Sequence, residues 1–175
     1  PNSDYAQSFY AATSSTLAKV SLYLKQNNNP GDRIIHIVAD NAGEPDTTSL
    51  ASGVLTSSLV GSSYAWIDVV FPSPATLTQG QTYWIVLDAT THASKYWMWC
   101  KDSGGGYANG DAQYSDDWDD DAWASVVGDL AFKVYWGEGF SQIDMVAVSG
   151  TAKANTITDS SIGGDAHYQT ISGTT

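Results

Sequence analysis

Short runs of alternating apolar and polar residues, set between clusters of turn-forming residues, restrict this chain to an all-β fold. A period of two residues is typical of a strand with one buried face, and no segment shows the 3.6-residue period of an amphipathic helix. The runs predict eight strands, at residues 7–12, 17–26, 33–40, 50–57, 64–71, 81–89, 94–101 and 129–136. Such a series predicts two packed antiparallel sheets, and the arrangement we expect is a jelly-roll sandwich.

The alternation also predicts which side chains face the core. The inward set is Val20, Leu22, Leu24, Ile67, Val69, Phe71, Leu130, Phe132, Val134 and Trp136. The outward set is Lys19, Ser21, Tyr23, Lys25, Trp66, Asp68, Asp129, Lys133 and Tyr135. Clusters of Asn, Gly and Pro at residues 27–31, 41–45 and 72–74 predict turns, because Gly and Asn tolerate positive φ and Pro lacks a ladder donor.

Composition changes after Gly137 and divides the chain into two parts. Residues 1–137 are expected to form the β-sandwich domain, and residues 138–175 form an extension rich in Thr, Ser and Gly. In the extension, Ile157, Ile162 and Ile171 lie among β-favouring threonines, with Ser and Gly at intervals of about ten residues. Two interpretations stand for this extension: short β-rungs or strands that pair with neighbouring strands or another copy, or a linker.

The charge balance argues against two kinds of partner. The 175 residues include 19 Asp and Glu against 7 Lys and Arg, which gives a formal net charge of −12. A nucleic-acid binder needs a basic surface, and no apolar run approaches the ~20 residues of a membrane span. We therefore expect no nucleic acid and no membrane insertion. Abundant Ser, Thr, Gly, Tyr and Trp with few lysines is typical of secreted prokaryotic modules, so we expect an extracellular or cell-surface location.

Residues 5–136 resemble a family of secreted bacterial and archaeal β-sandwich domains, including those of choice-of-anchor type proteins. The segments that carry the resemblance are AQSF at 6–9, LAKVSLYL at 17–24, YAW at 64–66, LTQGQTYWIVL at 77–87 and GDLAFKVY at 128–135. The resemblance implies an extracellular, non-catalytic jelly-roll module, often part of a larger surface or appendage protein. It supplies no catalytic residue to carry over, and the acidic run at 116–121 departs from the Gly and Ser expected there.

No motif for catalysis stands out in the chain. The histidines, His36, His92 and His167, lie in separate segments and in no nucleophile motif, and Cys100 is the single cysteine. His36 alternates with Ile35 and Ile37, so we expect it to face solvent in mid-strand. The prediction is a protein that is not an enzyme.

Two oxygen-rich clusters are candidates for Ca²⁺. The acidic run contains Asp116, Asp117, Asp119, Asp120 and Asp121, and Ca²⁺ takes six to eight oxygen ligands. The run lacks the glycine and terminal glutamate of an EF-hand, and the alternative is a solvated, mutually repelling loop. A fainter cluster is Asp40, Asn41, Glu44 and Asp46, which turn formation explains at least as well.

The candidate ligand-binding residues are aromatic. In the strand at 94–101, Tyr96, Met98 and Cys100 share one face, and Cys is among the most buried residue types. Lys95, Trp97, Trp99 and Lys101 share the other, which the lysines predict to be solvated. The two indoles then either form a platform for pyranose rings, extended by Trp66 and Asp68, or are covered by the loop that carries Trp118 and Trp123. The candidate set is therefore Trp66, Asp68, Trp97, Trp99, Trp118 and Trp123.

Together these features predict a non-catalytic extracellular module for carbohydrate binding or adhesion, with a polysaccharide or glycan as its partner. The alternative is a structural module of a surface filament, appendage or envelope protein, which associates with itself or with domains of its parent protein through residues 138–175.

Overall fold

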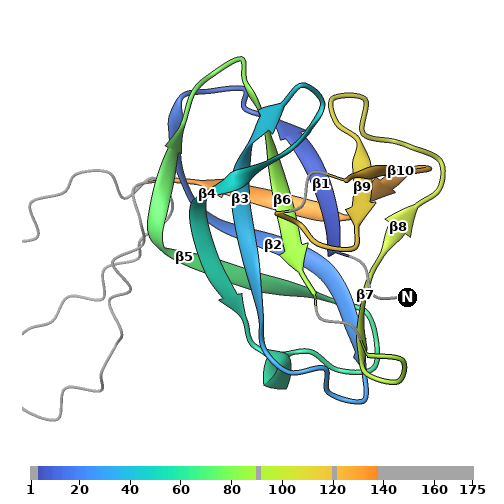
Figure 1. Cartoon of the computed structure of the whole chain (residues 1–175). Helices are drawn as coiled ribbons and strands as arrows, with labels where there is room; N and C mark the ends of the chain where they lie inside the picture. The colour runs from blue at the N-terminus through green and yellow to red at the C-terminus, as the bar shows by residue number, and fades with distance from the viewer. Residues whose placement is uncertain (1–3, 90–91, 120–121, 138–175) are drawn as a thin grey trace, which may run out of the picture. The chain divides into compact units, whose positions relative to one another are not determined.

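The computed structural model describes residues 4–89, 92–119 and 122–137, and this part of the chain is all-β (Figure 1). Its helical content is one 3₁₀ turn, Ser57–Leu59. The long strands are β1 (Asp4–Tyr10), β2 (Ser15–Asn27), β3 (Arg33–Asn41), β4 (Glu44–Leu55), β5 (Ala65–Leu77) and β6 (Thr82–Asp88). The shorter ones are β7 (Tyr96–Trp99), β8 (Lys101–Asp102), β9 (Ala112–Ser115), β10 (Ala124–Val126), β11 (Asp129–Leu130) and β12 (Phe132–Trp136).

The strands form two main antiparallel sheets that pack as a sandwich, which confirms the predicted fold class (Figure 1). The larger sheet has the order β10-β9-β1-β6-β3-β4. The smaller sheet has the order β12-β2-β5, and β7 also pairs with β2. A short ladder joins β8 to β11. The jelly-roll topology stays a prediction.

The core lies between the two sheets, where the period-two alternation places it. Val20, Leu22 and Leu24 are fully buried, as are Ile35 and Ile37 of the facing sheet. The two sheets approach each other closely where β4 meets β5. A Cβ on Gly53 would lie 2.5 Å from the Val70 carbonyl oxygen, so only glycine lets the two backbones approach this far.

Three local predictions are wrong. Residues 72–74 are not a turn between strands, because β5 continues through them as an edge strand. Its register with β2 shifts there, from Lys19↔Val70 to Leu17↔Ala75, and an edge strand tolerates a proline that donates no hydrogen bond. Asp129 is buried, and its Oδ2 accepts a hydrogen bond from the Tyr107 N–H at 2.9 Å. The third error is the omission of β9 and β10, which lie in the stretch expected to be loop.

A second apolar cluster covers the outer face of the larger sheet. It consists of Ala6, Val38, Trp84 and Val86, all buried, with Trp118 and Trp123 packed against it. The β3–β4 turn helps to hold it, because Trp84 Nε1 donates to Asp40 Oδ1 at 2.8 Å. The outer face of the larger sheet is therefore covered around Trp84, whereas Leu50 and Val54 of β4 are 44% and 53% exposed.

The extension at residues 138–175 lies outside the described residues, so the predicted β-rungs and their pairing stay predictions. Within the described ranges, no helix has the length and apolar character needed to cross a membrane.

Candidate functional site

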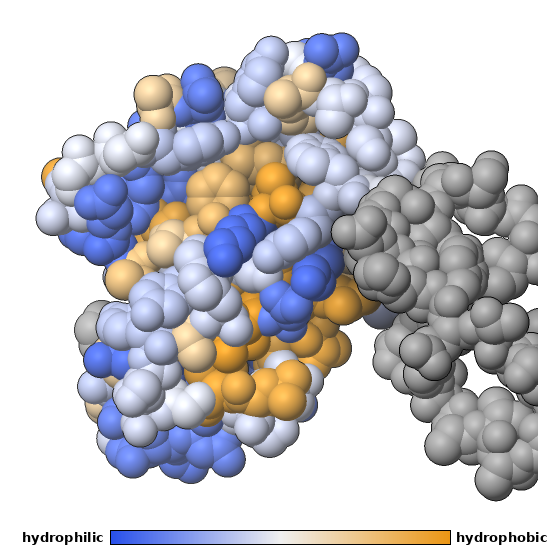
Figure 2. Space-filling model, turned by 180° about the vertical axis from the view of Figure 1, so that it is seen from behind, coloured by the Kyte–Doolittle hydropathy of each residue, from blue (hydrophilic) through white to orange (hydrophobic). Residues whose placement is uncertain are grey.

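Several large aromatic side chains remain exposed on the smaller sheet. Trp66, Tyr64 and Tyr135 are 42%, 37% and 36% exposed, although aromatic rings usually find cover. Figure 2 views the molecule from behind and shows hydrophobic residues gathered in the middle of that side, although Trp and Tyr lie near the middle of its hydropathy scale and are drawn in pale colours. Apolar surface that stays contiguous and exposed is typical of an interaction site.

The strand register brings these rings together on the face of the smaller sheet that points away from the core. Tyr23 lies opposite Trp66, Ser21 opposite Asp68, and Lys19 opposite Tyr135. We call this surface the aromatic face. Its members are Lys19, Tyr23, Lys25, Tyr64, Trp66, Asp68, Lys133 and Tyr135.

The rings of the aromatic face contact one another. The Tyr23 ring stacks on that of Tyr64, with centroids 5.5 Å apart, and lies 5.1 Å from the Trp66 ring. Two segments of the chain supply these residues, since Tyr23 lies in β2, whereas Trp66 lies at the start of β5 and Tyr64 just before it. A rigid sheet therefore presents the three rings as one surface.

Each of three lysines places its ammonium group over one of the rings. Lys133 Nζ lies 4.0 Å from the Trp66 ring centroid. Lys19 Nζ lies 4.1 Å from the centroid of Tyr135, and Lys25 Nζ lies 4.5 Å from that of Tyr64. A cation–π contact at an exposed site is worth about 0.5–1 kcal/mol, so these contacts orient the lysines without fixing them.

Asp68 is the acidic member of the aromatic face. Its Oδ2 pairs with Lys19 Nζ at 2.7 Å, and its Oδ1 accepts a hydrogen bond from the Ser21 hydroxyl. Partial burial raises the pKa of Asp68, but the hydrogen bonds from Lys19 and Ser21, together with the charges of Lys19 and Lys133, lower it below its ordinary value. Asp68 is therefore ionised at neutral pH and can accept hydrogen bonds. The predicted outward direction of Trp66 and Asp68 is confirmed.

The predicted direction of Trp97 and Trp99 is wrong. The two indoles share a face of β7, but this face packs on the core, where Trp99 is 9% exposed and Trp97 half-buried. The register explains the orientation: Trp99 lies opposite Leu24, and directly opposed residues point to the same side of a sheet. Trp99 Nε1 donates to the Ala131 carbonyl oxygen at 2.9 Å. The two indoles therefore do not form the exposed platform.

Trp118 and Trp123 do not lie over Trp97 and Trp99 either. They pack on the cluster around Trp84, on the outer face of the larger sheet. The Trp118 ring stacks on His36 at a centroid distance of 4.3 Å. His36 points away from the core as expected, but its side chain is only 13% exposed, so the expectation that it faces solvent is wrong. Burial lowers the pKa of His36, against the opposing effect of the Asp88 and Asp119 charges.

The acidic run is described in part, because Asp120 and Asp121 lie outside the described residues. A hydrogen bond and charge repulsion from Asp119 raise the pKa of Asp117, so these two carboxyls lie close together. The described ranges contain no group of three or more metal-ligating side chains. Calcium binding by Asp116, Asp117, Asp119, Asp120 and Asp121 stays a prediction.

The fainter cluster around Asp40 forms a hairpin turn. Ala42 and Gly43 both have positive φ, at 57° and 93°, as a two-residue hairpin loop requires. Asp40 Oδ2 accepts the Gly43 N–H at 3.1 Å, and Asp46 Oδ1 accepts the Thr48 N–H at 2.7 Å. These contacts support the turn interpretation of the cluster.

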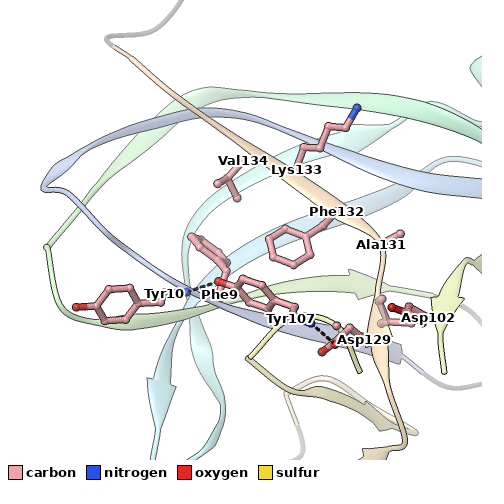
Figure 3. Close-up of a pocket in the computed structure, with 11 residues that line it drawn as sticks. Phe9, Tyr10, Asp102, Tyr107, Asp129, Ala131, Phe132, Lys133 and Val134 are labelled. Atoms are coloured by element: carbon pink, nitrogen blue, oxygen red, sulfur yellow. Dashed lines mark hydrogen bonds between the residues drawn. The ribbon is translucent and has the colours of Figure 1, made fainter. Parts of the chain in front are cut away.

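A groove of about 680 Å³ lies beside β12, lined by aromatic rings and two carboxylates (Figure 3). The Tyr107 hydroxyl accepts a hydrogen bond from the Tyr10 N–H at 3.1 Å. The Phe132 ring packs edge-on against the Tyr107 ring, with the ring centroids 5.3 Å apart. Asp102 Oδ1 accepts the Gly104 N–H at 2.9 Å. These internal contacts hold the loop after β8 in place. In Figure 3 the Lys133 side chain points away from the rings of the groove, and it belongs instead to the aromatic face.

A second cavity, of about 770 Å³, is lined mainly by apolar side chains of β7, β9, β10 and their neighbours. Trp97 lines it, and within the described residues its buried Nε1 has no hydrogen-bond partner. Its lining also includes four tyrosines, Ser125 and Lys101, and Tyr64 belongs to both this cavity and the aromatic face. The aromatic face differs in that it combines exposed rings with three ammonium groups and a carboxylate.

No family model, curated protein or solved structure matches this chain. The resemblance to domains of choice-of-anchor type stays a prediction, and the function has to be argued from the geometry.

Sequence patterning had already placed Lys19, Tyr23, Lys25, Lys133 and Tyr135 on outward faces without including them among the candidate binding residues. Pairing of β2 with both β5 and β12 is what joins them to Trp66. That pairing links residues more than 40 positions apart and carries no local signal.

Proposed function

We propose that this domain is a non-catalytic extracellular module that binds carbohydrate through the aromatic face. The observation that carries the proposal is a set of three neighbouring rings on one sheet, the exposed rings of Tyr64 and Trp66 and the half-buried ring of Tyr23 between them. Pyranose rings present C–H groups that stack on aromatic rings, and Asp68 and the lysines can bond to sugar hydroxyls. The aromatic face spans three strands, so a polysaccharide that crosses several rings fits it better than a small enclosed ligand does.

Binding by an open sheet also agrees with what the rest of the molecule provides. The groove beside β12 uses polar groups in internal hydrogen bonds, and Trp118 and Trp123 cover the outer face of the larger sheet around Trp84. The composition, rich in Ser, Thr and Gly, supports a secreted location.

The test is to measure polysaccharide affinity for Trp66→Ala against a matched control. Tyr10→Ala is suitable, because Tyr10 is 45% exposed on β1 and lies outside the aromatic face. One aromatic contact is worth about 0.5–1.5 kcal/mol, so Trp66→Ala is expected to weaken binding by about two- to tenfold while Tyr10→Ala leaves it unchanged. Equal affinities for the two variants, both folded by circular dichroism, would reject the aromatic face as the binding site.

A further inference from the structure

The aromatic face reverses the charge of the rest of the chain. Lys19, Lys25 and Lys133 are three of the seven basic residues in a chain whose formal net charge is −12. Asp68 is the one acidic residue among the described members of this face. Three ammonium groups and one carboxylate give the surface a local excess of positive charge, within a molecule that otherwise repels anions.

Two of the three lysines make no direct ion pair among the described residues, although the charge of Lys133 acts on Asp68 from a greater distance. Lys19 pairs with Asp68 at 2.7 Å, but Lys25 and Lys133 make no ion pair with any described residue. Their ammonium groups lie over Tyr64 and Trp66, at 4.5 Å and 4.0 Å from the ring centroids. A lysine side chain is flexible, and a ring attracts an ammonium group only weakly when both are exposed.

We propose that the ligand of the aromatic face is an anionic polysaccharide, whose carboxylates bind Lys25 and Lys133 while its sugar rings stack on Tyr64 and Trp66. This inference rests on the proposed carbohydrate function and adds the charge of the ligand. A neutral sugar that stacks on Trp66 must displace the ammonium of Lys133 from the ring and offers it no charge in return. A uronic acid that stacks on Trp66 also displaces this ammonium, but it supplies a carboxylate that the displaced ammonium then binds.

The two ligand types therefore predict opposite effects for one substitution. Lys133→Gln removes the ammonium that covers Trp66, so binding of a neutral polysaccharide is expected to be unchanged or tighter. The same variant removes an ion pair with an anionic polysaccharide, and an exposed pair of this kind corresponds to about a two- to fivefold loss of affinity. Lys25→Gln is expected to behave in the same way at Tyr64.

The experiment compares polygalacturonate with its fully methyl-esterified form, which keeps the sugar ring and loses the charge. Alginate and hyaluronate extend the acidic panel, and poly-L-glutamate serves as a polyanion without sugar. Lys101→Gln is the matched control, since Lys101 is exposed in β8 and outside the aromatic face. We expect an acidic polysaccharide to bind more tightly than the ester or poly-L-glutamate, with an affinity that falls as salt rises and falls further in Lys25→Gln and Lys133→Gln.

The outcomes separate the two proposals. In one outcome, the acidic and esterified polymers bind equally, and this binding is lost in Trp66→Ala but unaffected by the lysine variants. That outcome overturns the anionic ligand and leaves the carbohydrate function standing. Binding of poly-L-glutamate as tightly as the acidic polysaccharides shows attraction by charge alone and overturns the sugar recognition. If none of the acidic polysaccharides nor the ester binds, both proposals are rejected together.

Discussion

Replacement of Trp99 by alanine tests the direction in which β7 faces. Trp99 is 9% exposed in the core, beside the fully buried Leu24. Truncation of a core tryptophan costs about 3–5 kcal/mol of unfolding free energy, through lost transfer energy and the cavity left behind. The lost hydrogen bond to Ala131 adds little, because that carbonyl still accepts the Tyr23 N–H at 3.1 Å. The expected loss is a large part of the about 5–15 kcal/mol that stabilises a typical domain.

Trp66→Ala is the matched control for this measurement, because it removes the same side chain from the opposite face of the smaller sheet. Trp66 is 42% exposed and contacts Tyr23 and Lys133, so its loss is expected to cost about 1 kcal/mol or less. Urea unfolding of the full chain, followed by far-UV circular dichroism, gives both values. A Trp99→Ala variant destabilised no more than Trp66→Ala would show that Trp99 lies outside the core and that the β2–β7 register is wrong.

Three further predictions concern the backbone, the pH dependence and metal. Gly53→Ala is expected to destabilise the domain by about 1–3 kcal/mol, because its Cβ would lie 2.5 Å from a carbonyl oxygen. Gly61→Ala should be neutral in the same urea assay, because its Cβ would make only an ordinary contact with the Ser63 nitrogen at 4.0 Å. Burial raises the pKa of Asp4 from 3.8 to about 6, so between these pH values the folded state holds a proton that the unfolded state has lost. The contribution of Asp4 therefore lowers the free energy of unfolding as pH rises from 4 to 6. Asp4→Asn should remove that part of the pH dependence, and unchanged slopes of unfolding free energy against pH would contradict it. Calcium binding by residues 116–121 predicts that Tm rises with Ca²⁺ and falls with a chelator, and a constant Tm in metal-free protein would favour the solvated loop.

Period-two alternation predicted the long strands well. In β2 and β5, every residue assigned to the core is buried, because a single side of a long strand must pack and the pattern repeats often enough to be read. The alternation failed where strands are short. β9 has four residues and β10 has three, and so few positions do not distinguish a strand from a polar loop.

The error at β7 has the same origin. The period-two pattern places Lys95 and Lys101 on the face that Trp97 and Trp99 share, but β7 spans only Tyr96–Trp99. Lys95 precedes the strand, and Lys101 belongs to β8, which pairs with β11. The lysines therefore carry no information about the direction of the indoles. The decisive fact is the pairing of Trp99 with Leu24, which the local sequence does not contain.

The aromatic face was predictable strand by strand but not as one site. Alternation placed Tyr23 and Lys25 outward in β2, Trp66 and Asp68 outward in β5, and Lys133 outward near the end of the domain. Only the strand order β12-β2-β5 makes these residues neighbours. Strand order depends on contacts between distant segments, so a single sequence leaves the surface in separate pieces.

The tryptophans of this domain differ in how they are held, and the difference bears on function. Trp84 and Trp99 are buried, and their indole N–H groups donate to Asp40 and to the Ala131 carbonyl, so each is fixed by packing and by a hydrogen bond. Trp66 instead contacts a tyrosine ring on one strand and a flexible lysine on another. A ligand can displace the lysine without disturbing the core, because Val20, Leu22 and Leu24 hold β2 in place from the other side of the sheet. The aromatic face thus combines a rigid support with side chains that rearrange at small cost, and this combination suits reversible binding.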